Sequence, residues 1–306
     1  MNDQARGAAP ALGNVITVGD MKVGATMVFN HHTRPEFVAE SVQFVEAAGL
    51  NSVWLPEHVI FLPEYQSTYP YSADGKIPGS PEGVLDPFSA LTFIAASTRR
   101  IRLGTGICLV PQRQPIYTAK MVADLDYLSG GRVDFGVGIG WLKEEFEHLN
   151  MDFGKRAARC VEYVEVMQAL WAPGLAHYQG ETVTLDGCFF NPKPVQQPHP
   201  PIFFGGESDA ALRRVVSHGQ GWYGFNMSPE TLAARLQRLR EFADAADRDP
   251  DDILIYVGPA GHPINPETVG EYAELGVDQL VVPLAAGNLD KLSARTAAMM
   301  ERLGVV

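Results

Sequence analysis

Short apolar runs rich in Val and Ile alternate along the chain with longer stretches of helical periodicity. The apolar runs predict strands at residues 21–29, 52–55, 101–109, 132–139, 201–204, 221–225, 253–257 and 279–282. Apolar residues spaced three or four apart predict helices at residues 35–48, 87–98, 115–128, 209–218, 229–246, 266–275 and 289–303. The first helix shows the pattern clearly, because Phe37, Val38, Val42 and Val45 recur near helical spacing and Gly49 ends the run.

The order of these elements predicts the fold class. Continuous apolar strands that alternate with amphipathic helices are typical of a parallel sheet covered by helices. Eight strands that alternate with helices favour an α/β fold of the closed (β/α)8 type, a TIM barrel. We therefore expect one barrel domain over residues 20–306, preceded by a flexible leader at residues 1–19.

Two connections are longer than a plain barrel needs. The insertion after the second strand spans residues 56–86 and is rich in Pro, Gly, Tyr and Ser. The other lies between residues 171 and 200 and shows hairpin-like alternation around Tyr178 and Val183 before a Pro-rich segment. Long loops in compact domains are usually functional or disordered. Because the first loop leaves the carboxyl end of a strand, where barrel active sites lie, we favour a substrate lid over a passive insert.

Composition narrows the class of protein. The 306 residues are 46% hydrophobic and carry a net charge of −12, so disorder is excluded and no basic surplus exists for nucleic acid. No apolar run reaches the length of a membrane-spanning helix, and the first residues lack the apolar core of a secretory signal. Three cysteines without CxxC spacing suit a reducing compartment. We expect a cytoplasmic protein that binds neither nucleic acid nor membrane.

The first candidate for chemistry is His58, which follows Glu57 at the end of the predicted strand 52–55. Side chains at the carboxyl ends of barrel strands face the mouth of the barrel. Histidine is also the side chain that ordinarily exchanges protons near neutral pH. The alternative is a solvated imidazole in a loop, and the position of His58 favours function.

Glycines mark the ends of two further predicted strands. Gly104 and Gly106 lie in the third strand, and Gly138 and Gly140 end the fourth. Glycine in a strand often marks a bulge or the close approach of a ligand, although tight packing explains each one equally well. The lysine of a phosphate-binding P-loop is absent. Two glycine-ended strands in succession suggest a flat ligand across the mouth.

The strongest local signal follows the fifth predicted strand. That strand ends at Gly205 and Gly206, and Ser208 or Asp209 then caps the next helix. Free N–H groups and the helix dipole make such a turn a site for an anion such as phosphate. Glu207 would repel a phosphate unless its side chain points away. Simple helix capping is the alternative reading.

Other chemistries are poorly supported by the sequence. His31 and His32 invite a metal reading, but adjacent residues on a strand point to opposite faces, and no HxH or HxxxH spacing occurs. The GxSxG motif of serine hydrolases is also absent. We expect neither a metal site nor a serine nucleophile.

Five spaced motifs together resemble the bacterial luciferase-like superfamily. The motifs are SVWLPEH at residues 52–58, IRLGTG at 101–106, SGGRV at 129–133 with GVGIGW at 136–141, NPKPVQ at 191–196 and PPIFFGG at 200–206. They are most similar to the branch that uses coenzyme F420, an 8-hydroxy-5-deazaflavin. The resemblance extends in consistent order from residue 21 to about residue 225, and the last three units match only in pattern.

The resemblance implies a TIM barrel whose mouth holds the tricyclic ring. His58 matches the family histidine near the reactive ring carbon, and Glu57 matches the acidic residue before it, so both are expected in catalysis. The peptide bond between Gly106 and Ile107 matches a non-proline cis bond behind the ring. The cofactor-binding residues that this implies are Gly106, Ile107, Cys108, Gly138, Ile139, Gly140, Gly205, Gly206 and Glu207.

The chain departs from the family pattern in ways that bear on the substrate. Gln220 replaces a common aspartate, and Ile139 and Trp141 replace polar residues of some sugar-phosphate dehydrogenase relatives. The change at Ile139 and Trp141 argues against a sugar-phosphate substrate and for a more apolar one.

The resulting hypothesis is a homodimeric oxidoreductase that moves hydride between C5 of F420 and a small apolar organic molecule, with His58 as the acid or base. One alternative is a monooxygenase that uses reduced FMN and O2 and is fed by a separate reductase. A third possibility, from another class, is a flavin-binding protein without turnover.

Overall fold

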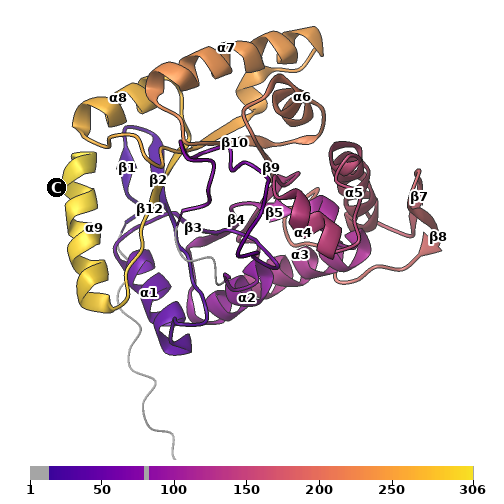
Figure 1. The fold of residues 1–306 in the computed structure, drawn as a ribbon, viewed down its shortest axis with the longest axis horizontal. Helices are drawn as coiled ribbons and strands as arrows, with labels where there is room; N and C mark the ends of the chain where they lie inside the picture. The colour runs from indigo at the N-terminus through magenta and orange to yellow at the C-terminus, as the bar shows by residue number, and fades with distance from the viewer. Residues whose placement is uncertain (1–13, 79–82, 306) are drawn as a thin grey trace, which may run out of the picture.

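Eight parallel strands close into a barrel in the computed structural model, which describes residues 14–78 and 83–305. In spatial order the strands are β2 (Met21–Thr26), β3 (Ser52–Leu55), β4 (Arg102–Thr105), β6 (Val133–Gly138), β9 (Ile202–Gly205), β10 (Gly221–Phe225), β11 (Leu254–Gly258) and β12 (Gln279–Pro283). The barrel closes because β12 pairs in parallel with β2, and Figure 1 shows the helices surrounding it. The predicted TIM barrel is confirmed.

Helices cover the outside of this barrel. They are α1 (Pro35–Ala47), α2 (Pro87–Ser97), α3 (Pro115–Ser129), α4 (Lys143–His148), α5 (Arg156–Trp171), α6 (Asp209–His218), α7 (Pro229–Ala245), α8 (Pro266–Glu274) and α9 (Leu289–Leu303). Short 3-10 helices lie at Val110–Gln112 and Pro250–Asp252. The helices α4 and α5 lie after the predicted strand 132–139, where the sequence pattern predicted no helix. The buried residues Cys160, Val164, Met167 and Trp171 of α5 do recur at helical spacing, so the signal was present.

Aromatic side chains fill the inside of the barrel. The cluster contains Trp54, Phe203, Tyr223, Tyr256 and Val281, with Trp54 stacked on Tyr223 at 5.0 Å between ring centroids. A Cβ on Gly104 would lie only 2.3 Å from the Trp54 ring. Gly104 is therefore explained by packing against Trp54 and does not mark a ligand.

The predicted strand at residues 101–109 is interrupted. β4 ends at Thr105, and the two-residue strand β5 (Cys108–Leu109) resumes the pairing with β6. The bond between Gly106 and Ile107, in the gap, is a cis peptide, as the resemblance implies. The first predicted strand also ends early, at Thr26, because the chain then turns into the loop that leads to α1.

The amino-terminal residues are more ordered than expected where they are described. Residues 1–13 of the predicted leader lie outside the described residues. Thr17–Val18 forms β1, antiparallel to the start of β2, and Ile16 N–H donates to the Gly49 carbonyl at 2.9 Å. Backbone hydrogen bonds therefore tie residues 16–18 of the predicted leader to the barrel.

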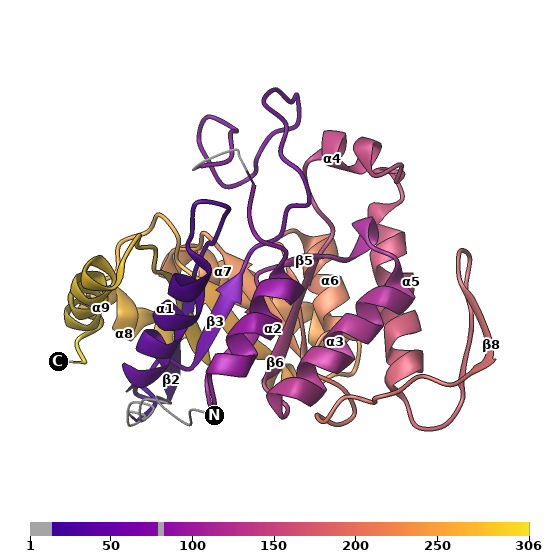
Figure 2. The ribbon, with the colours of Figure 1, turned by 90° about the horizontal axis from the view of Figure 1, so that it is seen from below.

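Both long connections appear where the sequence predicts them. Residues 176–188 contain the antiparallel pair β7 (Ala176–Gln179) and β8 (Thr184–Cys188), which confirms the hairpin. The loop between β3 and α2 rises above one end of the barrel beside α4 (Figure 2). No helix in the described ranges has both the length and the apolar character to cross a membrane.

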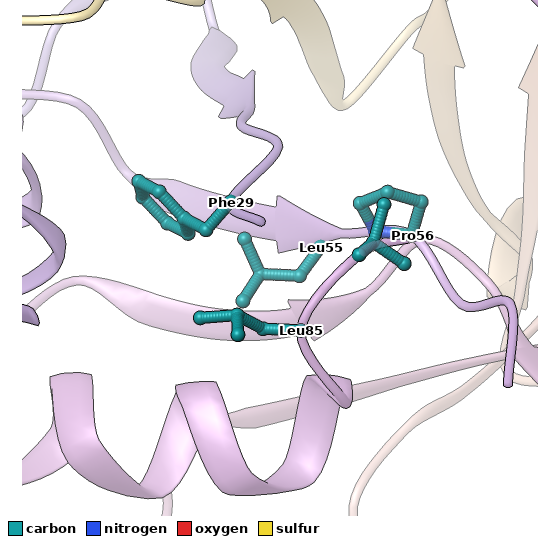
Figure 3. A pocket seen from close by; sticks show the side chains of 5 residues that line it. Phe29, Leu55, Pro56 and Leu85 are labelled. Carbon is teal, nitrogen blue, oxygen red and sulfur yellow. The ribbon is translucent and has the colours of Figure 1, made fainter. Parts of the chain in front are cut away.

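The two ends of the long loop meet at the barrel. Leu85 N–H donates to the Phe29 carbonyl at 2.8 Å. Figure 3 shows Phe29, Leu55, Pro56 and Leu85 around a small apolar hollow there, which Val84 also lines. None of these side chains is an acid or a base. The contacts around this hollow hold the two ends of the loop together, and its lining has no side chain that could act as an acid, a base or a nucleophile.

Candidate active site at the barrel mouth

Several predicted cofactor residues meet around the side chain of Ile107. A Cβ on Gly138 would lie 2.0 Å from Cδ1 of Ile107, and one on Gly205 would lie 2.8 Å from the same atom. The carboxyl ends of β6 and β9 thus leave room for the side chain that follows the cis bond after Gly106. Ile107 is only partly buried and packs on the aromatic interior of the barrel. It therefore forms part of the floor of the mouth.

The other predicted cofactor residues are divided between the mouth and the core. Gly140 (φ 77°) and Gly206 (φ 96°) adopt left-handed backbone that favours glycine. Ile139, between Gly138 at the end of β6 and Gly140, is half-buried. The Cys108 side chain has no exposed surface, and burial raises the pKa of its thiol well above the usual range. The structure thus places the Cys108 thiol in the hydrophobic core and away from the mouth.

His58 is paired with a buried carboxylate that is distant in the sequence. Nδ1 of His58 lies 3.0 Å from Oε2 of Glu145. Glu145 is in α4, 87 residues after His58 in the sequence. The His58 side chain is 10% exposed and that of Glu145 is 0% exposed. The other ring nitrogen, Nε2, makes no hydrogen bond to the described residues. The imidazole is held at one nitrogen and free at the other.

Glu145 also holds the start of the long loop. Its Oε1 accepts from the N–H groups of Val59 at 2.8 Å and Ile60 at 3.2 Å, and its Oε2 accepts from Nε2 of Gln112 at 3.0 Å. Burial by itself would raise the pKa of Glu145, but the hydrogen bonds and the charge of His58 outweigh it and lower the pKa. Glu145 is therefore held as a carboxylate facing His58.

Glu57 points the other way from its neighbour His58. Its Oε2 accepts from Leu109 N–H at 2.6 Å, and its Oε1 accepts from Nε of Arg113 at 2.6 Å. Nη2 of Arg113 also donates to Oδ2 of Asp86, the residue that caps α2, at 2.7 Å. Both carboxylate oxygens of Glu57 are thus occupied in a buried network. This geometry suits a residue that positions β5, and the catalytic role expected for Glu57 stays a prediction.

Glu207 is directed away from the turn that contains it. Its Oε1 accepts from Phe225 N–H at 3.0 Å, and its Oε2 accepts from the Tyr71 hydroxyl at 2.9 Å. Burial raises the pKa of Glu207 in spite of these two hydrogen bonds. Of the two predicted caps of α6, Ser208 is the one observed, and its hydroxyl accepts from Ala211 N–H at 3.2 Å. The carboxylate consequently does not block an anion at the Gly205–Gly206 turn.

The long loop lines the mouth with aromatic rings. Tyr65 and Tyr69 contact Trp141 edge to face at 5.5 and 5.2 Å between centroids, and Trp141 contacts His58 at 5.8 Å. Glu144 fastens the loop to α4, because its Oε2 accepts from the Ser67 hydroxyl at 2.6 Å. The surroundings of His58 are therefore apolar and aromatic on the side of the loop.

Two arginines, Arg156 and Arg214, have no carboxylate partner among the residues that the structure describes. Arg156, the first residue of α5, donates from Nε to the Gly140 carbonyl at 3.2 Å. The buried Nε of Arg214, on α6, has no hydrogen-bond partner among the residues described. Sequence reasoning did not single out either arginine.

Sequence reasoning also missed Glu145 and Arg113. The adjacent carboxylates Glu144 and Glu145, just after the glycine-ended strand β6, were an available signal. Arg113 had no comparable signal, because its partner Glu57 is 56 residues away along the chain.

The fold is a closed α/β barrel, and the candidate site lies at the carboxyl ends of its strands. This is the place of the active site in TIM-barrel enzymes. The sequence model of the luciferase-like monooxygenase family matches residues 20–279. The chain belongs to this family, whose members are oxidoreductases or monooxygenases.

Known proteins similar to the chain carry different cofactors. The uncharacterised protein Rv0953c of Mycobacterium tuberculosis is 32% identical over 269 residues, which cover 87% of this chain and 92% of that protein. The coenzyme F420-dependent tetrahydromethanopterin reductase from Methanopyrus kandleri is 18% identical, with a TM-score of 0.69 over 92% of this chain and 98% of that one. A riboflavin lyase solved with a modified FMN is 19% identical, with a TM-score of 0.65 over 83% and 66% of the two chains. These two solved structures support the shared fold.

Proposed function

We propose that this protein is a coenzyme F420-dependent oxidoreductase that transfers hydride between C5 of the deazaflavin and a small apolar organic substrate. The observation that carries the proposal is the geometry of His58, whose Nδ1 is held by Glu145 while Nε2 is free at the barrel mouth. Histidine so placed is suited to give or take the proton that accompanies hydride transfer.

The residues at the mouth fit a flat ring that carries a phosphate. Ile107 forms a floor between Gly138 and Gly205, where larger side chains would collide with it. The turn at Gly206 offers backbone N–H groups at the start of α6, and the carboxylate of Glu207 is turned toward Tyr71. When bound there, the deazaflavin supplies a carbon that accepts or donates a hydride.

The protein residues then have separate tasks. Glu145 accepts the Nδ1 proton of His58 in a hydrogen bond and so selects the tautomer whose Nε2 faces the substrate. Trp141 and Tyr65 exclude water and offer apolar contact to the substrate. Glu57 holds β5, and with it the floor of the site, through Leu109 N–H.

Reduced FMN is the second candidate for the cofactor. The family description names monooxygenases, and a solved structure with the same fold holds a modified FMN. With FMN and O2 the same site would serve a monooxygenase fed by a separate reductase. The homodimer implied by the resemblance stays a prediction in either case.

The test is a titration of the purified protein with F420 and with FMN, followed by tryptophan fluorescence, since Trp141 lies at the mouth. We expect F420 to bind more tightly than FMN. Tight FMN binding without a response to F420 would replace the first candidate with the second. Binding of a cofactor with no turnover of any substrate would favour the third, non-catalytic reading.

The role of His58 is tested by His58→Ala, with His148→Ala on the exposed face of α4 as the matched control. We expect the His58 variant to bind cofactor normally and to lose most of its turnover, about a hundredfold or more. The control should keep wild-type turnover. Equal turnover in both variants would remove His58 from the mechanism.

A further inference from the structure

The long loop after β3 reaches across the mouth to the opposite side of the barrel. Its residues 59–77, here called the lid segment, include Tyr71, whose ring contacts the Phe225 ring edge to face at 4.9 Å between centroids. Phe225 ends β10, and β10 stands opposite β3 in the closed order of the eight barrel strands. The lid segment, which rises above this end of the barrel in Figure 2, therefore crosses the mouth.

The side of the lid segment next to α4 is held by a group of hydrogen bonds. Oε1 of Glu144 accepts from the N–H groups of Gln66 and Ser67, and its Oε2 accepts from the Ser67 hydroxyl at 2.6 Å. The same hydroxyl accepts from Lys143 N–H, at the start of α4, at 3.0 Å. This side of the lid segment is therefore attached to α4 at several points.

The opposite side of the lid segment is held by one hydrogen bond. The Tyr71 hydroxyl donates to Oε2 of Glu207 at 2.9 Å, while Oε1 of Glu207 accepts from Phe225 N–H at 3.0 Å and so fixes the carboxylate. Within residues 14–78 and 83–305, no other hydrogen bond joins the lid segment to β9, β10 or the turn after β9. Burial and the charge of Glu207 raise the pKa of the Tyr71 hydroxyl, which therefore keeps the proton that it donates.

We propose that the hydrogen bond between Tyr71 and Glu207 is a latch that holds the lid segment closed, and that the lid opens on this side while it stays attached to α4. One hydrogen bond breaks more readily than a group of them, so the side held by Tyr71 opens first. Glu207, which the resemblance places among the cofactor-binding residues, then also serves the lid. The passage of substrate under the open lid rests on the proposed function, whereas the latch acts without any cofactor.

Trp141 reports whether the lid is open. The rings of Tyr65 and Tyr69 lie edge to face on Trp141, which is half-buried. The other three tryptophans are at most 1% exposed and are Trp54, Trp171 and Trp222. Acrylamide, a small quencher of tryptophan fluorescence, should therefore reach Trp141 first when the lid opens.

Lys76 gives a second readout of the same motion. It is the only Lys or Arg between residues 56 and 86, so trypsin can cut this loop only after Lys76. In the closed lid, Nζ of Lys76 donates to the Tyr65 carbonyl at 3.2 Å and lies 4.2 Å from the centroid of the Tyr65 ring. Cleavage of a segment that opens and closes rapidly follows the population of its open form.

The experiment measures acrylamide quenching and limited trypsin cleavage of the protein without cofactor. Tyr71→Phe removes the hydroxyl and keeps the ring against Phe225. The matched control is Tyr117→Phe on α3, where the side chain is 74% exposed. Circular dichroism and the thermal midpoint of each variant establish that it folds.

We expect Tyr71→Phe to raise the rate of cleavage after Lys76 about tenfold or more, and to increase the quenching of Trp141. Glu207→Gln keeps an oxygen that can accept from Tyr71, so its effect should be smaller and in the same direction. The control should match the wild type in both readouts.

The latch is refuted if Tyr71→Phe leaves either readout at its wild-type value, since a lid that opens on this side both exposes Trp141 and frees Lys76. It is also refuted if cleavage after Arg238, within α7, rises by the same factor, because that result indicates unfolding of the whole barrel. The titration with F420 and FMN tests the proposed function separately. Failure of the latch therefore leaves the proposed function intact, and failure to bind either cofactor leaves the latch intact.

Discussion

The substitution Glu145→Gln tests the partner of His58 most directly. It keeps the size of the side chain and an oxygen that can accept from Val59 and Ile60, and it removes the negative charge that faces Nδ1. The carboxylate is 0% exposed, so its hydrogen bond to His58 is screened little by water. A charge-assisted hydrogen bond of this kind contributes about 1.5–3 kcal/mol.

If that energy holds the reactive tautomer of His58, its loss should slow turnover about ten- to 150-fold. The assay measures kcat at saturating cofactor and substrate, with Glu147→Gln on the exposed face of α4 as the control. A second readout needs no cofactor, because the nitrogen-15 shifts of the His58 imidazole report which nitrogen carries the proton. We expect a proton on Nδ1 in the wild type and a mixture of tautomers in the variant.

The double variant separates positioning from a general structural effect. In a His58→Ala background, Glu145→Gln should cause no further loss of kcat, since the two residues act as one unit. The reasoning is refuted if Glu145→Gln keeps wild-type kcat and an unchanged imidazole spectrum. It is equally refuted if the losses from the two single substitutions multiply in the double variant.

Three further predictions follow from the geometry of the mouth. Arg113→Ala should lower the free energy of unfolding by about 3–5 kcal/mol in urea titrations, because it leaves the buried Glu57 carboxylate without its counter-charge; a loss below 1 kcal/mol would contradict this. Gly138→Ala should fold with a penalty of about 1 kcal/mol, since its Cβ meets the flexible end of Ile107, and should weaken cofactor binding by displacing that floor; unchanged affinity would contradict the assignment. Burial raises the pKa of Glu207 above its ordinary value of 4.5, so the folded state holds this proton more tightly than the unfolded state. The stability that the bound proton contributes below pH 4.5 is lost as pH rises through the folded pKa. Glu207→Gln should therefore gain in thermal midpoint relative to the wild type as pH rises from 4.5 to 7, and a constant difference over that range would argue against the burial penalty.

Much of the barrel could be predicted because its signals are local. Apolar runs and helical periodicity depend on neighbouring residues, and they located the eight strands of the barrel. The interruption at Gly106 and Ile107 could be placed only through the resemblance, since the apolar pattern runs through residues 101–109 unbroken. The helix α5 was not predicted although its buried face has helical spacing, and charged residues such as Glu162 and Glu165 interrupt its apolar pattern.

In the candidate site too, local sequence signals located some residues, and only the structure showed what those residues contact. The glycines at 138 and 205 were predicted as ligand contacts, and they lie at the mouth, where their immediate neighbour is Ile107. Gly104 shows the opposite outcome, because it contacts Trp54 inside the barrel. Glycine reports that space is tight at a position, and only the folded chain shows what occupies that space.

The sequence by itself determined the barrel, the place of His58 at the end of a strand, and the glycine turns around the mouth. The tertiary structure decided which carboxylate serves His58. Glu57 is adjacent to His58 in the chain, but successive side chains of extended backbone point in opposite directions, so Glu57 faces Arg113. Glu145 reaches His58 from 87 residues away because β6 and α4 bring it over the mouth. Pairings between distant residues depend on how the strands close into a barrel, and this closure cannot be predicted from the pattern of neighbouring residues.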